Sequence, residues 1–271
     1  MKYSPLRLVF VLWLVGLSSW AQALVFAVNE GVTYRVGSEE IRARYAAIAA
    51  DLSTQLGQPV RVEPVSDYPT LRRGLADKSY DLALVHPTHI SILAIKNSGY
   101  RLVAVTKGYT EYAARFLVRA DSPLKSLAEL RERRCGAPEE DSITAWITRA
   151  TLRDALGGDK RCEMTYTRYQ DAVPFMVEHT FTHVGATASN AVVKDWESKG
   201  GRVLARSRPV PIKHVIASPA LSAEQVERLR GYFTTLDASE AGRKKLETLK
   251  VSGYTSYDTA ALLDLGRWLG L

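Results

Sequence analysis

Short apolar runs alternate with amphipathic segments along most of the chain. Residues 81–85 are almost continuously apolar, which is typical of a strand buried in a parallel sheet. Residues 39–56 carry apolar side chains at helical spacing and are followed by Gly57, so they are predicted to form a helix. The same reasoning predicts strands at 24–28, 60–65, 102–106, 113–119, 134–137, 162–166, 183–187, 203–207 and 214–218, and helices at 68–77, 88–97, 127–132, 145–156, 169–178, 188–199, 222–236, 239–249 and 259–269.

Alternation of strands and helices predicts an α/β fold with parallel sheets. Two such series follow one another without a long linker or an internal repeat, so we expect two lobes. Each lobe should contain a mixed, mainly parallel sheet flanked by helices. Lobe 1 is expected to comprise residues 24–115 plus about 210–271, and lobe 2 residues 116–209.

The first 23 residues have the three parts of a secretory signal peptide. Lys2 and Arg7 form a basic start, residues 8–20 are apolar, and a small-residue A-x-A site ends at Ala23. We therefore expect cleavage after Ala23 and export to the periplasm. A lipoprotein would carry cysteine at the next position, where Leu24 stands, so a freely diffusing protein is expected.

Charge and motif content exclude several classes of protein. The net charge is +7, and loss of Lys2 and Arg7 would leave +5, a mild excess that suits a small anionic ligand. No dense basic run of the kind that binds nucleic acid occurs. The chain has no G-x-S-x-G, P-loop or G-x-G-x-x-G motif, so neither an enzyme nor a cofactor is predicted. We expect a monomer.

Cys135 and Cys162 are the two cysteines of the chain. In an oxidising compartment such a pair is first interpreted as a disulfide. Each begins a predicted strand and one helix lies between them, so neighbouring strands could bring them together. The alternative is a thiol pair that binds a soft ion such as arsenite.

Ser142 and Thr144 lie where a predicted strand leads into a predicted helix. A helix N-terminus presents unpaired N–H groups and the positive end of the helix dipole, and can bind an anion. The alternative interpretation is an ordinary N-cap, because serine and threonine are favoured there. Ligands of α/β sheets bind beyond the carboxyl ends of strands, which places residues 29–35, 66–68, 86–89 and 141–144 around one cleft.

An ordered series of short motifs runs through the chain: SDYP at 66–69, KSYDLA at 78–83, Tyr112, and DSPLKSLAEL at 121–130. The series resembles the periplasmic substrate-binding proteins of phosphate, phosphite and phosphonate ABC importers, the PhnD-like family, over nearly all of the mature chain. The resemblance implies a two-lobed periplasmic-binding-protein fold of type II-like architecture. It also implies a small oxyanion as ligand and an inner-membrane ABC permease as partner.

The resemblance further implies which residues bind the ligand. The family binds phosphoryl oxygens with a Ser-Thr-Ser turn at the start of a helix in the second lobe. Ser142 and Thr144 match its outer hydroxyls, and Ile143 replaces the middle one. Tyr68 and Tyr112 fall where tyrosines of the family assist.

Four further positions depart from the family pattern. Tyr169 replaces a histidine, and Asn190 and Lys213 stand where aminophosphonate binders place carboxylates for the ligand's ammonium group. A cationic tail should then be rejected, so 2-aminoethylphosphonate is disfavoured. His86 could donate to an oxyanion, and we expect its charge to be tunable near neutral pH.

Two other roles remain open from the sequence. His86 and His89, together with His179 and His183, could suggest zinc or copper capture, but residues 179–183 run from a helix into a strand, and no H-E-x-x-H motif occurs. We therefore predict no metal site. The protein could also deliver its ligand to a membrane sensor kinase in place of a permease.

Overall fold

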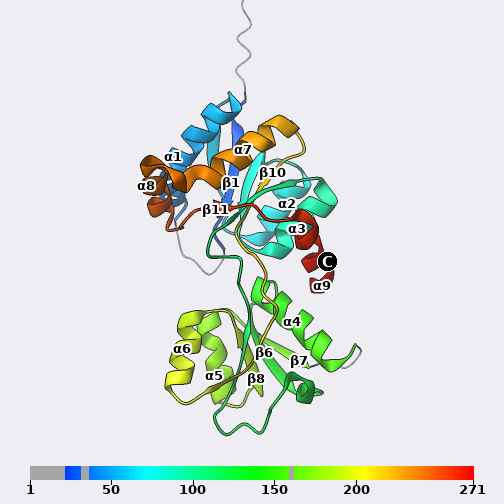
Figure 1. Cartoon of the computed structure of the whole chain (residues 1–271). Helices are drawn as coiled ribbons and strands as arrows, with labels where there is room; N and C mark the ends of the chain where they lie inside the picture. The colour runs from blue at the N-terminus through cyan, green and yellow to red at the C-terminus, as the bar shows by residue number, and fades with distance from the viewer. Residues whose placement is uncertain (1–21, 32–36, 159–161) are drawn as a thin grey trace, which may run out of the picture.

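The computed structural model describes residues 22–31, 37–158 and 162–271. Of the predicted signal peptide, residues 1–21 lie outside the described residues. The described part forms two lobes that are joined by two chain crossings (Figure 1). Within it, no helix is both long and apolar enough to cross a membrane.

Lobe 1 is built on a sheet with strand order β11-β4-β10-β3-β1-β2. Alternate residues of β1 face opposite sides: Phe26 and Val28 pack with α1, α7 and α8, whereas Val25 and Ala27 belong to the core that contains α2, α3 and α9. The strands are β1 (Leu24–Asn29), β2 (Val60–Pro64), β3 (Leu82–Val85), β4 (Arg101–Thr106), β10 (His214–Ala217) and β11 (Tyr254–Thr255). The helices are α1 (Ser38–Leu56), α2 (Tyr68–Ala76), α3 (Thr88–Ser98), α7 (Ala223–Thr235), η3 (Leu236–Ala238), α8 (Glu240–Leu249) and α9 (Thr259–Leu269).

Lobe 2 is built on a sheet with strand order β7-β6-β8-β5-β9. A side chain at Gly185 of β8 would place its Cβ 2.6 Å from Val173 and 2.7 Å from Val177, so glycine lets α5 pack directly on the strand. The strands are β5 (Arg115–Val118), β6 (Arg134–Pro138), β7 (Glu163–Thr167), β8 (Val184–Thr187) and β9 (Arg202–Arg206). The helices are η1 (Leu127–Leu130), α4 (Ile143–Leu156), η2 (Gln170–Ala172), α5 (Val173–Glu178) and α6 (Asn190–Ser198).

The prediction of mixed, mainly parallel sheets flanked by helices is confirmed, because most strands of each sheet run in one direction. β1 is parallel to β2 and β3, and β6 is parallel to β7 and β8. In contrast, β10 is antiparallel to β3 and β4, and β5 is antiparallel to β8 and β9. The strands that oppose the main direction are β5, β10 and the short β11, and β5 and β10 directly follow the crossings at residues 107–114 and 207–213. A chain that enters a lobe from the other one inserts against the direction of its neighbours.

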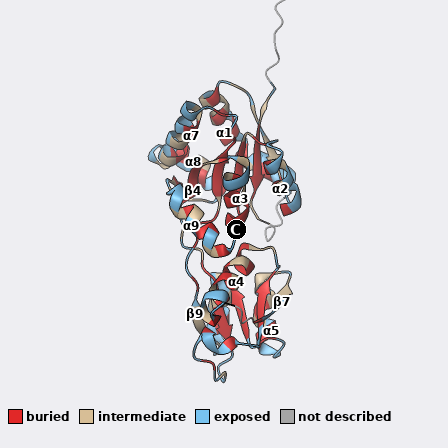
Figure 2. Cartoon of the chain, turned by 90° about the vertical axis from the view of Figure 1, so that its right-hand side faces the viewer, coloured by how far each residue is buried: buried red, intermediate tan, exposed pale blue. Residues whose placement is uncertain are grey.

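The two lobes also touch through helices. α9, at the carboxyl end of the chain, packs on α3 of lobe 1 and on α4 of lobe 2. Ile147 of α4 and Leu262 of α9 belong to one buried cluster, and the indole of Trp268 donates to Asp154 at 2.6 Å. Buried residues line both sheets and continue into α3 and α4 (Figure 2). The lobes are therefore packed against each other in this conformation.

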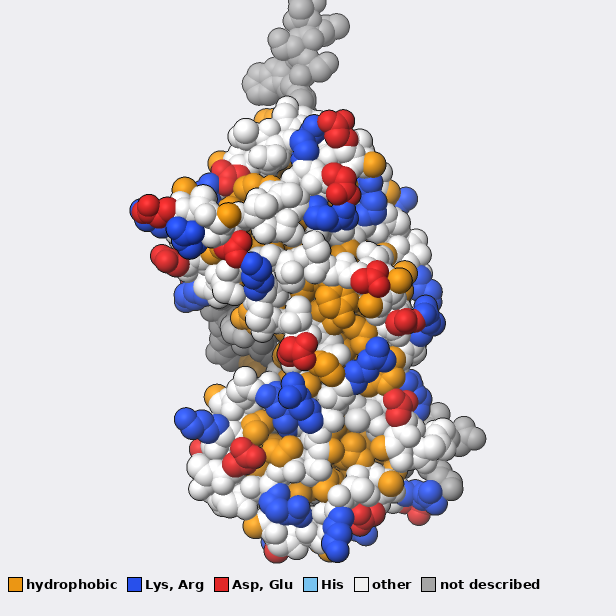
Figure 3. Space-filling view, in the orientation of Figure 1, with side chains coloured by type: hydrophobic (Ala, Val, Ile, Leu, Met, Phe, Trp, Pro, Cys, Tyr) orange, Lys and Arg blue, Asp and Glu red, His pale blue; other side chains and the backbone are white. Residues whose placement is uncertain are grey.

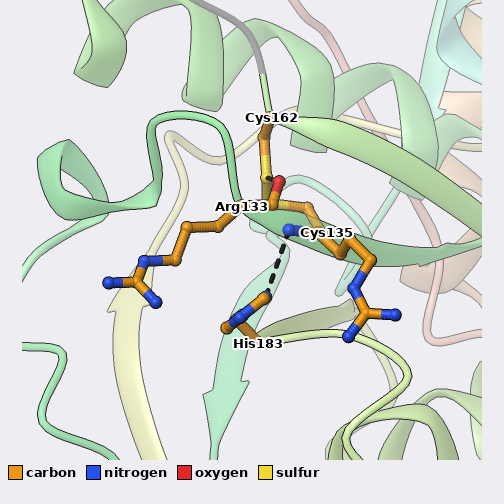
Figure 4. Close-up of a disulfide and its surroundings, with 5 residues drawn as sticks. Arg133, Cys135, Cys162 and His183 are labelled. Atoms are coloured by element: carbon orange, nitrogen blue, oxygen red, sulfur yellow. Dashed lines mark hydrogen bonds between the residues drawn. A yellow bond between two sulfur atoms is a disulfide. The ribbon is translucent and has the colours of Figure 1, made fainter.

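The predicted disulfide between Cys135 and Cys162 is present (Figure 4). Cys135 lies in β6, and Cys162 immediately precedes the parallel strand β7. Their Cα atoms are 5.9 Å apart, within the usual range for a bridge. Both side chains are buried, so this bond joins the amino ends of two neighbouring strands inside lobe 2.

Candidate ligand-binding cleft

Two cavities flank Tyr169, which lines both of them. A cavity of about 680 Å³ lies where the crossing at 107–114 meets lobe 2, and its lining includes Tyr112 and Asn190. A cavity of about 650 Å³ lies between the lobes, and its lining includes Tyr68 and Asp141. Basic side chains gather beside the constriction between the lobes (Figure 3). Four of the ligand-binding residues expected from the sequence thus line these two cavities: Tyr68, Tyr112, Tyr169 and Asn190.

A chain of hydrogen bonds connects the start of α4 to the start of α6. The hydroxyls of Thr144 and Tyr112 are 2.7 Å apart, and the Gln170 amide nitrogen donates to the Tyr112 hydroxyl at 3.1 Å. The Gln170 carbonyl accepts from the Thr187 hydroxyl at 3.0 Å and from the Ala188 backbone N–H at 2.6 Å. Sequence reasoning missed Gln170 because a single glutamine outside any motif gives no signal.

Ser142 and Thr144 have different surroundings. Ser142 is the N-cap of α4, and its hydroxyl accepts from the Ala145 N–H at 3.1 Å, so the capping interpretation describes its side chain. Thr144 is only 1% exposed, and its hydroxyl contacts that of Tyr112 in the first crossing. The two side chains therefore form a hydrogen-bonded pair of hydroxyls at the start of α4.

An ion pair that was not predicted connects the lobes. Arg72 of α2 forms a bidentate bond with Asp141, at 2.7 and 2.6 Å, directly before α4. His89 Nε2 lies 3.4 Å from the same carboxylate, and its ring stacks on Trp146 with centroids 5.4 Å apart. Tyr68 packs edge-on against His89 at 6.2 Å. Burial raises the pKa of Asp141, but hydrogen bonds from His89 and Arg72 outweigh it and hold the pKa well below its usual range.

The Arg72–Asp141 pair is expected to stabilise the packed arrangement of the lobes. A double-mutant cycle with Arg72→Gln and Asp141→Asn should give a coupling of about 1–2 kcal/mol, because the bidentate bond is half-buried. The measurement is urea unfolding of the four proteins. Arg119 and Asp121 supply the control, since they form an exposed pair within lobe 2 whose coupling should be clearly weaker. Equal couplings for the two pairs would contradict this role.

His86 and Lys213 lie side by side at the lobe 1 end of the second crossing. The Lys213 N–H donates to the His86 carbonyl at 3.1 Å, and Lys213 Nζ lies 4.1 Å from the centroid of the Tyr109 ring. The expectation that His86 changes charge near neutral pH was wrong. Burial, followed by the charge of Lys213, lowers the pKa of His86 to about 3. His86 is therefore a neutral imidazole in the folded protein at neutral pH.

Acidification is expected to destabilise the protein from about pH 6.5 downward. Burial lowers the pKa of His86 to about 3 and that of His214 to about 4, whereas both should titrate near 6.5 when unfolded. Their stabilising contribution is complete above pH 6.5 and is lost as the pH falls toward the folded values. Each should contribute a slope of up to about 1.4 kcal/mol per pH unit. Urea unfolding between pH 4 and 7 measures this slope.

His86→Gln should reduce the slope, because the variant no longer carries this buried imidazole. A slope that is the same in the variant and in the original protein would contradict the assignment to buried histidine.

Asn190 is the first residue of α6 and accepts a hydrogen bond from Arg115. Tyr169 is half-buried and its ring lies 5.3 Å from the guanidinium of Arg168. The structure therefore brings Thr144, Tyr112 and, through Gln170, the start of α6 into one network. Tyr68 lines the cavity of about 650 Å³, whereas Lys213 is not among the lining residues of either cavity.

The histidines do not form a metal centre in the described part of the chain. Within residues 22–31, 37–158 and 162–271, no group of three or more His, Cys, Asp or Glu side chains has a geometry that could hold a metal ion. His183 Nδ1 instead accepts from the Arg134 N–H at 3.2 Å, and His179 packs on Phe175 with centroids 4.2 Å apart. The bond to His183 is visible beside the disulfide (Figure 4).

A family profile described as "ABC transporter, phosphonate, periplasmic substrate-binding protein" matches residues 31–262. The chain belongs to this family. It is therefore the periplasmic substrate-binding protein of a phosphonate-type ABC transporter. Members of this family are binding proteins, not enzymes. No curated protein matches the sequence.

Solved structures of binding proteins share the fold. XAC2383 from Xanthomonas citri bound to ATP has a TM-score of 0.72 at 16% identity, with 92% of this chain and 97% of that chain covered. PhnD1 from Prochlorococcus marinus (MIT 9301) in complex with methylphosphonate has a TM-score of 0.64 at 15% identity, with coverages of 91% and 96%. The periplasmic aliphatic sulphonate binding protein SsuA from Escherichia coli has a TM-score of 0.53 at 17% identity, with coverages of 92% and 79%. These similarities confirm the two-lobed periplasmic-binding-protein fold.

Proposed function

We propose that this protein captures a small phosphorus oxyanion, of the phosphate, phosphite or simple phosphonate type, and delivers it to the permease of an ABC importer. The observation that supports the site most directly is the contact of Thr144 with Tyr112 at the N-terminus of α4. It puts two hydroxyls that the family resemblance singled out separately at one helix end, where an anion is favoured.

The proposed binding mechanism uses the first turn of α4. The N–H groups of Ala145 and Trp146 are already donated to Ser142. The N–H groups of Ile143 and Thr144 are the ones we assign to the oxyanion, because the first N–H groups of a helix have no partner within it. We assign the Thr144 hydroxyl as a further donor to the oxyanion.

Closure about the crossings at 107–114 and 207–213 would then bring Tyr68 of lobe 1 over the ligand and present the packed form to the permease. His86, which is neutral at physiological pH, can donate one hydrogen bond but adds no charge. Lys213 supplies a cation beside it, which disfavours a ligand with an ammonium tail. Membership in the ABC transporter family favours delivery to a permease over delivery to a sensor kinase.

Isothermal titration calorimetry with phosphate, phosphite, methylphosphonate, 2-aminoethylphosphonate, sulfate and ATP tests the proposal. We expect binding of at least one of the first three ligands in the micromolar range or tighter, and weaker binding of 2-aminoethylphosphonate and sulfate. ATP is included because a structural relative was solved with it. Binding of ATP or sulfate alone, or preference for 2-aminoethylphosphonate, would contradict the proposed ligand class.

A further inference from the structure

The cavity of about 680 Å³ is larger than a single tetrahedral oxyanion requires. Its volume lies within the range of about 300–1,000 Å³ that is usual for small-molecule sites. Its walls come from the crossing at 108–112, the start of β5, the segment 169–171 and the start of α6. A ligand that fills it must carry a substituent beyond the oxyanion.

Two arginines stand side by side in this cavity. Arg115 and Arg206 are paired across β5 and β9, and both line the cavity. Arg115 donates to neutral oxygens, namely the carbonyls of Ala113 at 3.0 Å and Ala188 at 3.3 Å and the side chain of Asn190. Neither arginine forms a salt bridge with any described residue of the chain. Burial, followed by the charge of Arg206, lowers the pKa of Arg115, as expected for a cation that lacks a counter-ion.

The bond from Arg115 also fixes how Asn190 faces the cavity. Because the carbonyl oxygen of the Asn190 side chain accepts from Arg115, its NH₂ group is turned the other way, as a donor. Asn190 begins α6, whose N-cap is Ser189, so the positive end of that helix reaches the same place. Two carboxylates, Glu111 and Asp171, also belong to the lining. Both are exposed, as are Arg206 and Asn190, so the half-buried Arg115 carries the charge that water screens least.

A chain of hydrogen bonds connects this cavity to the proposed oxyanion site. Gln170 connects the Tyr112 hydroxyl to the Ala188 N–H, and Ala188 in turn accepts from Arg115. Tyr112 lines the cavity and its hydroxyl contacts that of Thr144, so an oxyanion bound at the start of α4 would lie next to this cavity.

We propose that the cavity binds a second anionic group of the ligand, a carboxylate joined by a short carbon linker to the phosphorus oxyanion, through Arg115 and the NH₂ group of Asn190, with Arg206 adding positive charge. This inference rests on the proposed function, because it assumes that the oxyanion binds at the start of α4. It narrows the ligand class to carboxylated phosphonates.

The test is calorimetric titration of the protein with methylphosphonate, phosphonoacetate and 2-aminoethylphosphonate. Phosphonoacetate should bind at least about tenfold tighter than methylphosphonate, since a charge-assisted bidentate contact is gained. Arg115→Gln should remove most of this preference. Asn190→Asp should weaken the binding of phosphonoacetate and strengthen the binding of 2-aminoethylphosphonate, because it places a carboxylate beside the ligand's tail. Arg202→Gln is the control: Arg202 lies at the other end of β9 and donates to the carbonyls of Ser122 and Leu124.

The outcomes separate this inference from the proposed function. Absence of binding by all three ligands would contradict both. Binding of methylphosphonate with no preference for phosphonoacetate would overturn the inference alone, as would a preference that survives both Arg115→Gln and Asn190→Asp. Thermal unfolding of each variant identifies loss of folding. If Arg115→Gln does not fold, Arg206→Gln and Asn190→Asp replace it, and each should reduce the preference for phosphonoacetate over methylphosphonate.

Discussion

Replacing Thr144 with valine is expected to weaken binding of methylphosphonate and phosphate by about 10- to 150-fold. The substitution keeps the shape of the side chain and removes the hydroxyl that contacts Tyr112 at 2.7 Å. A hydrogen bond to a charged group contributes about 1.5–3 kcal/mol, which corresponds to this range of dissociation constants. Calorimetric titration of the original protein and of the variant measures the change directly.

Thr148 supplies a matched control for this substitution. It lies one turn further along α4, is fully buried, and donates its hydroxyl to the Thr144 carbonyl at 2.7 Å. Thr148→Val should lower stability to a similar degree as Thr144→Val and leave affinity within about twofold, because its hydroxyl serves only the helix. Equal loss of affinity in both variants would mean that damage to α4, and not loss of a ligand contact, explains the result.

The elements could be predicted where their signals are local. The helix expected at residues 39–56 is observed as Ser38–Leu56, and the apolar run at 81–85 contains β3, Leu82–Val85. Strand direction could not be predicted in the same way. β10 runs antiparallel to β3 because the chain returns to lobe 1 after crossing from lobe 2, and no residue within β10 reports the direction from which it enters.

The site was predictable only in part, for the same reason. The resemblance named Thr144 and Tyr112 separately, and the fold brings their hydroxyls together. The Arg72–Asp141 pair joins residues that are 69 positions apart, and neither residue belongs to a motif. The charge of His86 was mispredicted because its burial arises from β3 pairing with β10, which also carries Lys213 to its side.

Removal of the disulfide is expected to lower the free energy of unfolding by about 3–4 kcal/mol. Cys135 and Cys162 are separated by 27 residues, and this estimate follows from the loop entropy that the bond removes from the unfolded chain. The variant Cys135→Ala with Cys162→Ala should therefore unfold at a clearly lower urea concentration. The original protein treated with dithiothreitol serves as an independent comparison and should approach the stability of the variant.

Affinity should respond differently from stability in that variant, because of where the disulfide lies. Cys135 is near the start of β6, whereas residues 141–144 follow the end of this strand. The disulfide and the proposed oxyanion site therefore lie toward opposite ends of β6. Methylphosphonate should bind the oxidised protein and the double variant within about twofold at temperatures where both are folded, since sites without shared partners act independently. A large loss of affinity would show that the disulfide positions α4. Stabilisation of the oxidised protein by arsenite would require another site, because its two thiols are consumed in the bond.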